Sequence, residues 1–316
     1  MFAIVSKVIS IFLIMAVGFG LYKKDIFTAK STKYFVDLLL LVTTPCMILS
    51  SITSKEFDTS MALSMLQVFG LACGFFAVAS FAGWFIFTKV VKDIPKEDLG
   101  VYIFSFASVN NGFMGFPITQ AIFGGDIFYF MILHNIVLSF YLYGPGPLIL
   151  SINHPGAKLN FKTLLKKVVN PSIVASVIGI VMLVSGLHLP AMLFDTVSTI
   201  GDITVPLSML VVGMQLGDTD IRNTFKNKIL VVMAMLKMML MPFIVFLLVN
   251  WLPIAATVKV CIIFGSVFPS AVVTSAVTLI ENKNATLAAE CIAVSTLMSV
   301  VTIPVIAMLL CGYYGM

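Results

Sequence analysis

Ten long apolar runs determine what this chain can fold into. They cover approximately residues 3–21, 34–52, 61–88, 99–123, 127–150, 168–187, 191–216, 229–251, 254–280 and 285–312. An apolar stretch of about 20 residues forms a helix that crosses a hydrocarbon core roughly 30 Å thick. Charged residues make up only 10% of the chain, against roughly a quarter in soluble proteins. The sequence therefore predicts an all-α polytopic membrane protein with ten transmembrane helices in a lipid bilayer.

Basic residues are concentrated in alternate loops between these runs. Of the 19 Lys and Arg residues, 15 lie in the first, third, fifth, seventh and ninth loops, and only Lys7, Lys55 and Lys259 lie on the opposite face. The positive-inside rule places the Lys-rich loops in the cytoplasm. We therefore expect a cell-membrane protein with both termini outside the cytoplasm. The net charge of +5 does not indicate a nucleic-acid partner, because the basic residues are spread among short loops.

The two halves of the chain show signs of an internal repeat. Five spans in each half mean that related halves would be inverted relative to each other in the membrane. Prolines of spans two, four and five recur nearly half a chain later in spans seven, nine and ten: Pro45, Pro117, Pro145 and Pro147, then Pro206, Pro269 and Pro304. We predict a first five-helix repeat over residues 1–150, a cytoplasmic linker over 151–167 and a second, inverted repeat over 168–316. Such repeats are typical of secondary transporters. The alternative is chance, since proline is frequent in membrane helices.

Spans four and nine contain residues that a continuous helix would avoid. The candidate substrate-binding residues in them are Asn110, Asn111, Gly112 and Pro117 in span four, and Gly265, Ser266, Pro269 and Ser270 in span nine. Proline removes a backbone donor and clashes with the preceding turn, so backbone groups freed in the apolar core must meet protein, water or ligand. If both helices break and cross, their half-helix N-termini present positive potential, which favours an anion. The alternative is two kinked helices packed through small residues.

Ionisable residues within the apolar runs are few, and such residues are costly in a membrane and commonly functional. Asp202 precedes Thr204 in the proline-interrupted span seven, and both are candidate ligands for a coupling ion, H⁺ or Na⁺. An ordinary helix-end carboxylate is the alternative for Asp202. Glu290 in span ten is a further coupling candidate, with a buried ion pair to Lys237 as its alternative.

Span five adds a polar pair, His134 and Asn135. We include Asn135 among the candidate substrate-binding residues, because the pair is positioned to face the expected crossing. A packing pair with satisfied hydrogen bonds is the alternative.

The sequence lacks the motifs of the common enzyme classes. It has no phosphate-binding Walker loop, no His-Glu-x-x-His and no Gly-x-Ser-x-Gly. Its five Cys show no metal-binding spacing. We predict a protein that is not an enzyme and carries no cofactor or metal, and any transport would be driven by gradients.

Four segments, taken in order, resemble a known family. They are Asn-Asn-Gly-Phe-Met-Gly-Phe-Pro at 110–117, Asn-Pro-Ser-Ile at 170–173, the stretch 201–213 with its central proline, and 295–304, which begins Ser-Thr-Leu. With ten spans, this pattern is similar to the auxin efflux carrier family almost end to end. Plant members of this family have a long hydrophilic loop between spans five and six. Here that loop is only about residues 151–167, so the chain resembles the compact bacterial branch associated with malate, malonate and similar carboxylates.

The resemblance implies a fold similar to that of bile acid sodium symporters. Spans one, two, six and seven would form a scaffold, and the other six a moving core in which the fourth and ninth helices cross. The residues that match the family's binding site are Asn110, Asn111, Pro117, Gly265, Pro269 and, in span five, Asn135.

We therefore expect a secondary active transporter of small organic anions that works by alternating access at the mid-membrane crossing. The substrates would be mono- or dicarboxylates such as malate or malonate, or auxin-like acids. One alternative is a membrane-embedded sensor that binds a ligand without moving it. Another is an anion channel, which needs a pore lined by repeated charge. The oligomeric state is left open, with a homodimer as one candidate.

Overall fold

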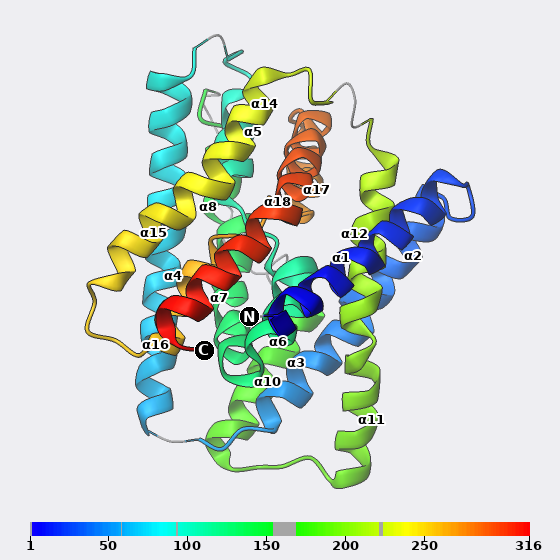
Figure 1. Cartoon of the computed structure of the whole chain (residues 1–316), viewed down its shortest axis with the longest axis vertical. Helices are drawn as coiled ribbons and strands as arrows, with labels where there is room; N and C mark the ends of the chain where they lie inside the picture. Colours follow the sequence, from blue (N-terminus) through cyan, green and yellow to red (C-terminus); the bar gives the residue numbers. More distant parts are fainter. Residues whose placement is uncertain (1, 58, 93, 154–168, 221–223) are drawn as a thin grey trace. The chain divides into compact units, whose positions relative to one another are not determined.

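The computed structural model of this chain is built from helices (Figure 1). It describes residues 2–57, 59–92, 94–153, 169–220 and 224–316. Most of the predicted cytoplasmic linker, residues 154–167, lies outside this described part, as does Arg222.

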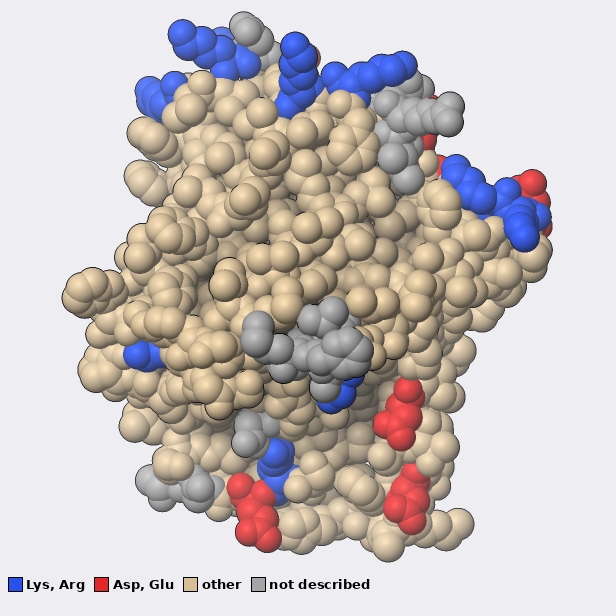
Figure 2. Space-filling model, in the orientation of Figure 1, with Lys and Arg blue, Asp and Glu red and all other residues tan. Residues whose placement is uncertain are grey.

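Six helical segments of the described chain are long and apolar enough to cross a bilayer. They are Ser6–Lys23, Ala29–Thr53, Ser60–Val90, Ala191–Asp218, Lys228–Asn250 and Ala285–Tyr314, and shorter apolar helices cover Ile127–Tyr143, Pro171–Ser185 and Ala256–Gly265. Uncharged side chains cover most of the face shown in Figure 2. These features confirm a polytopic helical membrane protein, and the count of ten spans stays a prediction.

The helices divide into two compact units, each of which draws on both halves of the sequence. Unit 1 comprises residues 1–67, 112–133 and 169–218, and unit 2 comprises 68–111, 134–168 and 219–316. The helices α4 (Thr59–Phe85) and α7 (Gly125–Tyr143) contribute to both units. Unit 1 thus contains predicted spans one, two, six and seven, the group that the family resemblance assigns to a scaffold.

Unit 1 is held together by close helix packing. Its elements are α1 (Phe2–Lys23), α2 (Ala29–Leu38), η1 (Leu39–Thr43), α3 (Thr44–Thr53), α6 (Phe116–Phe123), α10 (Pro171–Ser185), α11 (Ala191–Asp202) and α12 (Thr204–Asp218). The α1 and α12 helices lie side by side (Figure 1) and approach closely, since a Cβ at Gly213 would overlap the Met15 carbonyl and one at Gly18 would overlap the Leu210 carbonyl. Small residues permit this backbone approach, which is typical of membrane helix pairs. The α3 helix packs against α10 and α11.

Unit 2 contains the remaining helices, among them α5 and α16, which end at the breaks in spans four and nine. Its elements are η2 (Ile86–Val90), α5 (Leu99–Ala107), α8 (Pro145–Leu150), α14 (Lys228–Met235), η4 (Leu236–Leu240), α15 (Met241–Asn250), α16 (Ala256–Gly265), α17 (Val273–Ile280) and α18 (Ala285–Tyr314). The α18 helix packs against α5, α14, α16 and α17.

Spans four and nine are both interrupted, as their composition predicts. Span four consists of α5, a non-helical link at 108–110, the π-helical turn η3 (Asn111–Gly115) and α6. Span nine consists of α16 and α17 with a non-helical link around Pro269. Pro269 lies within the link of span nine, and glycine lies beside each link, with Gly112 in η3 and Gly265 at the end of α16. Both residue types weaken the backbone hydrogen-bond ladder. The structure therefore confirms that neither span is one continuous helix.

Candidate functional site

The break in span four begins at Ser108, which caps the C-terminal end of α5. Ser108 adopts an extended conformation, with φ −72° and ψ 144°, so the helix stops and its last carbonyl groups lack the following turn. Asn110 and Asn111 come directly after and are 2% and 0% exposed. The break thus places two amide side chains in the protein interior.

The breaks in spans four and nine contact each other within unit 2. Asn110 N donates a hydrogen bond to Pro269 O at 2.8 Å. Ser108 Oγ and Thr274 Oγ1 are hydrogen-bonded at 2.8 Å, and both side chains are fully buried. Backbone and side-chain groups freed by one break are therefore partly satisfied by the other, as buried polar groups require.

The two serines that are predicted substrate ligands in span nine form hydrogen bonds to other groups of the protein. Ser270 Oγ donates to Ser105 O at 2.6 Å, and Ser270 N donates to Ser295 Oγ at 3.1 Å. Ser266 Oγ donates to Ile263 O at 2.6 Å and so helps to end α16. In the described structure these hydroxyl groups hold the backbone in place.

Asn111 forms a buried pair with His134, which lies on α7. Asn111 Nδ2 lies 2.7 Å from His134 Nδ1, and both side chains are 0% exposed. An amide nitrogen only donates, so Nδ1 accepts, and a neutral imidazole then carries its proton on Nε2. Asn111 Oδ1 and His134 Nε2 are buried and have no hydrogen-bond partner among the described residues. The pair therefore has one unused acceptor and one unused donor.

The surroundings of His134 are tight and aromatic. The rings of Phe75 and Phe76 lie 5.6 and 5.4 Å from the imidazole, centroid to centroid. On α16, a Cβ added at Gly265 would lie 3.1 Å from His134 Nε2. Glycine at this position therefore permits the close approach of α16 to the imidazole.

Asn135 is less involved than its neighbour. It is only half-buried, and the interaction that fixes its backbone is a hydrogen bond from Ser139 Oγ to Asn135 O at 3.0 Å. Of the polar pair in span five, the sequence predicts Asn135 as the site residue, whereas His134 is the one that contacts Asn111. The signal for His134 was that it is the one histidine of the sequence within an apolar run, a costly position for a polar side chain.

Four predicted site residues belong to unit 1. Gly112 is half-buried and Pro117 is buried in the first turn of α6, which packs against α1 and α12. Asp202 is exposed at the end of α11. Thr204 is 0% exposed, and its Oγ1 has no hydrogen-bond partner in the described part of the chain.

The alternative of a buried ion pair between Lys237 and Glu290 is wrong. Lys237 lies on η4 and is 1% exposed, and its ammonium donates to Phe106 O at 2.7 Å and Ser108 O at 2.5 Å. Glu290 is half-buried on α18 and forms no ion pair with Lys237 in the described structure. The physical reason is the break in span four, which exposes carbonyl groups at the negative end of the α5 dipole.

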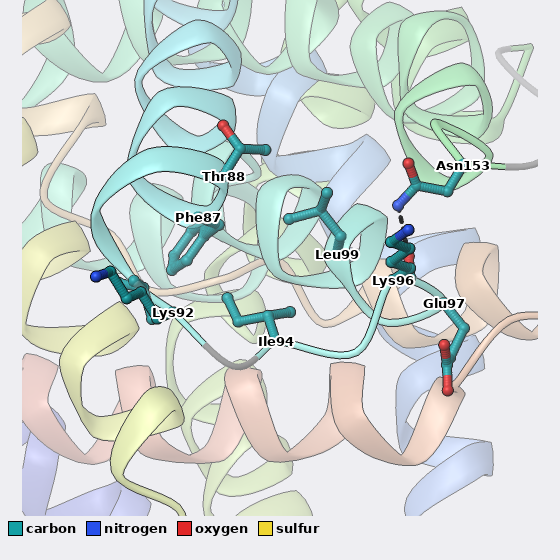
Figure 3. A pocket seen from close by; sticks show the side chains of 9 residues that line it. Phe87, Thr88, Lys92, Ile94, Lys96, Glu97, Leu99 and Asn153 are labelled. Carbon is teal, nitrogen blue, oxygen red and sulfur yellow. Dashed lines mark hydrogen bonds between the residues drawn. The ribbon is translucent and has the colours of Figure 1, made fainter.

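Two surface hollows lie away from these residues. In unit 2, a cavity of about 710 Å³ is lined by Phe87, Thr88, Val91, Lys92, Ile94, Lys96, Glu97, Leu99 and Asn153. Figure 3 shows Asn153 pointing to the backbone of Lys96, where its Nδ2 donates to Lys96 O at 2.7 Å. In unit 1, a cavity of about 390 Å³ is lined by residues 53, 55–57 and 182–188. Neither cavity includes a predicted site residue.

Apolar helices that break within the membrane-spanning region and bury polar groups at the break are typical of membrane transport proteins. Comparison with family models agrees with this class: the model described as "Membrane transport protein" matches residues 3–161 and 154–307. The chain therefore belongs to this membrane transport protein family, the auxin efflux carrier family of the sequence analysis. It is a transporter and not an enzyme. A comparison with curated proteins found no match.

Proposed function

We propose that this chain is a secondary carrier of small organic anions, with a mono- or dicarboxylate as substrate. The observation that carries the proposal is the buried Asn111–His134 pair, with its unused Oδ1 and Nε2 atoms at the break in span four. A buried polar atom without a partner costs about 1–3 kcal/mol. A ligand that supplies these partners recovers this free energy, so the pair is a natural place for a polar substrate.

The charge near the break supports an anion rather than a cation. The Lys237 ammonium is buried and bonded to Ser108 O, two residues before Asn110. Bringing a second cation near a buried ammonium costs free energy, and an anion is attracted. In this proposal the carboxylate accepts a hydrogen bond from His134 Nε2–H, and a hydroxyl or protonated carboxyl group donates to Asn111 Oδ1. Malate and malonate are the first substrates to test, followed by auxin-like acids.

The proposal includes alternating access, and the division of the chain into two compact units supports it. In the proposed cycle, unit 2 carries the anion site and moves against unit 1, and the two sequence halves, 1–150 and 168–316, act as inverted repeats. The proposal includes ten spans and the extracytoplasmic termini derived from the distribution of basic residues.

Counterflow in proteoliposomes tests this function. Vesicles containing purified protein are loaded with unlabelled malonate and diluted into a trace of labelled malonate, and the assay is repeated with malate and an auxin-like acid. A carrier shows saturable uptake that internal substrate accelerates. A channel conducts without this acceleration, and a sensor shows no flux, so either result would contradict the proposal.

A further inference from the structure

The break in span four leaves a half-helix C-terminus whose carbonyl groups are satisfied by three different partners. Phe104 O accepts from Ser108 N at 2.9 Å, in the last turn of α5 itself. Ser105 O accepts from Ser270 Oγ, which comes from span nine. Phe106 O and Ser108 O both accept from the Lys237 ammonium, which comes from span eight. A single cation thus binds two carbonyl oxygens at the negative end of this helix.

Lys237 is held at this end by a local irregularity in its own span. It lies in the π-helical turn η4, directly before α15, which has Pro242 in its first turn. Proline cannot donate to the carbonyl of the preceding turn, and a widened turn is a common way to accommodate it. Such turns occur frequently at functional sites.

The environment of the ammonium is that of an ion-binding site rather than of an ion pair. Its side chain is 1% exposed, and no carboxylate forms an ion pair with it in the part of the chain that the structure describes. A buried charge needs compensation, which here comes from carbonyl oxygens and the negative end of the α5 dipole. Unwound carbonyls and half-helix C-termini are the ligands that bind Na⁺ in transporters with discontinuous helices.

We propose that Lys237 is a tethered cation that occupies, through its Nζ atom, the place of a free coupling metal ion at the α5 terminus. The carrier then needs no free Na⁺ at the end of α5, because the ammonium of Lys237 supplies the positive charge there. This inference rests on the proposed carrier function, but it makes a statement about cation binding that does not require a substrate.

The test is a titration of purified protein with Na⁺ alone, against choline at constant ionic strength, with the melting temperature Tm as the readout. The wild-type protein should show no saturable response to Na⁺. Lys237→Met removes the charge, leaves Phe106 O and Ser108 O without their donor and should lower Tm. Added Na⁺ should then raise Tm saturably by about 2–4 °C, because a ligand that binds only the folded state stabilises it.

Three further variants make the result specific. Lys237→Arg keeps the cation and should remain insensitive to Na⁺. Lys237→Gln is neutral but retains a donor, so it provides a second Na⁺-responsive variant should Lys237→Met not fold. Lys259→Met is the matched control, since Lys259 Nζ also donates to a backbone carbonyl, Asn250 O at 2.9 Å, and is only half-buried. It should not acquire a Na⁺ response.

Two results would overturn the inference: saturable stabilisation of the wild-type protein by Na⁺, or folded Lys237→Met and Lys237→Gln proteins that do not respond to Na⁺. The second result would leave Lys237 as an ordinary donor to the end of α5. The Na⁺ titration contains no carboxylate substrate. A negative result in it is therefore distinguishable from a negative result in the counterflow assay.

Discussion

Asn111 Nδ2 lies 2.7 Å from His134 Nδ1, and this contact joins the break in span four to span five within unit 2. Both side chains are fully buried, so neither exchanges the contact for water. The imidazole therefore fixes the orientation of the amide, and the amide fixes the tautomer of a neutral imidazole. We regard this pair as the centre of the anion site.

Replacing His134 tests whether the pair matters for both stability and binding. His134→Phe fills the space but leaves Asn111 Nδ2 without its acceptor, which should cost about 1–3 kcal/mol of stability. We expect a lower Tm and weaker malonate uptake, and partial recovery in His134→Gln, which can still accept a hydrogen bond. The control is His188→Gln, because His188 is exposed. Wild-type Tm and uptake in His134→Phe would show that the pair has no role.

Gly265 offers a second test because its missing side chain lets His134 Nε2 approach α16 closely. Gly265→Ala would place a methyl group 3.1 Å from that atom and should reduce carboxylate affinity about tenfold, through overpacking of roughly 1–2 kcal/mol. Gly265→Val should abolish binding. Gly74→Val is the control within unit 2, since a Cβ there meets nothing within 4 Å. Unchanged affinity in folded Gly265→Val protein would place the substrate elsewhere.

Membrane topology is tested by thiol labelling in intact cells. Lys96 is exposed in the third loop, on the predicted cytoplasmic side. Trp251 is 86% exposed and is the last residue of predicted span eight, next to the eighth loop on the opposite side. On a Cys-free background, Trp251→Cys should react with an impermeant thiol reagent and Lys96→Cys should react only after the membrane is permeabilised. The reverse pattern would overturn the predicted orientation and, with it, the positive-inside argument for this chain.

Asp202 remains a predicted ligand for a coupling ion, H⁺ or Na⁺. Its side chain is exposed at the end of α11, two residues before the buried Thr204. Asp202→Asn should make uptake independent of a pH or Na⁺ gradient, while exchange of substrate without a gradient persists. Asp195→Asn, an exposed position on the same helix, should keep the gradient dependence. If both variants respond to the gradient like the wild type, Asp202 is an ordinary helix-end carboxylate.

The sequence predicts the interruptions of spans four and nine well, because the cause is local. Pro269 lies within the link of span nine and Gly265 directly before it, so that helix stops where the sequence indicates. In span four the break lies at 108–110, a few residues before Gly112 and Pro117, which lie in η3 and α6. The apolar runs likewise predict helices wherever the structure has them. Hydropathy does not show where a run divides into shorter helices. The run 127–150, for example, contains a separate helix at its end, α8.

The partners at the breaks depend on long-range packing and were not predictable from local pattern. Ser108 and Thr274 are 166 positions apart, and Lys237 and Phe106 are 131 positions apart. Opposite charge suggested Glu290 as the partner of Lys237, because side-chain charges are visible in a sequence. The carbonyl groups of a broken helix are not visible in this way, and they proved to be the acceptors.

The central claim is that the break in span four binds an anion, and the affinity of Asn111→Asp for malonate tests it most directly. This change hardly alters volume but places a negative charge beside the substrate. At about 4 Å and an effective dielectric constant near 20, the repulsion is on the order of 4 kcal/mol, or roughly a thousandfold in affinity. Protonation of the aspartate reduces this repulsion, so affinity should recover as the pH falls.

The measurement is malonate affinity of monodisperse protein across pH, with Asn110→Asp in parallel because Asn110 lies at the same break. We predict a large loss of affinity at neutral pH in Asn111→Asp and partial recovery at acidic pH, measured on the folded fraction because the variant also loses the Nδ2 donor to His134. Well-folded Asn111→Asp and Asn110→Asp proteins that both bind malonate with wild-type affinity at neutral pH would contradict the claim.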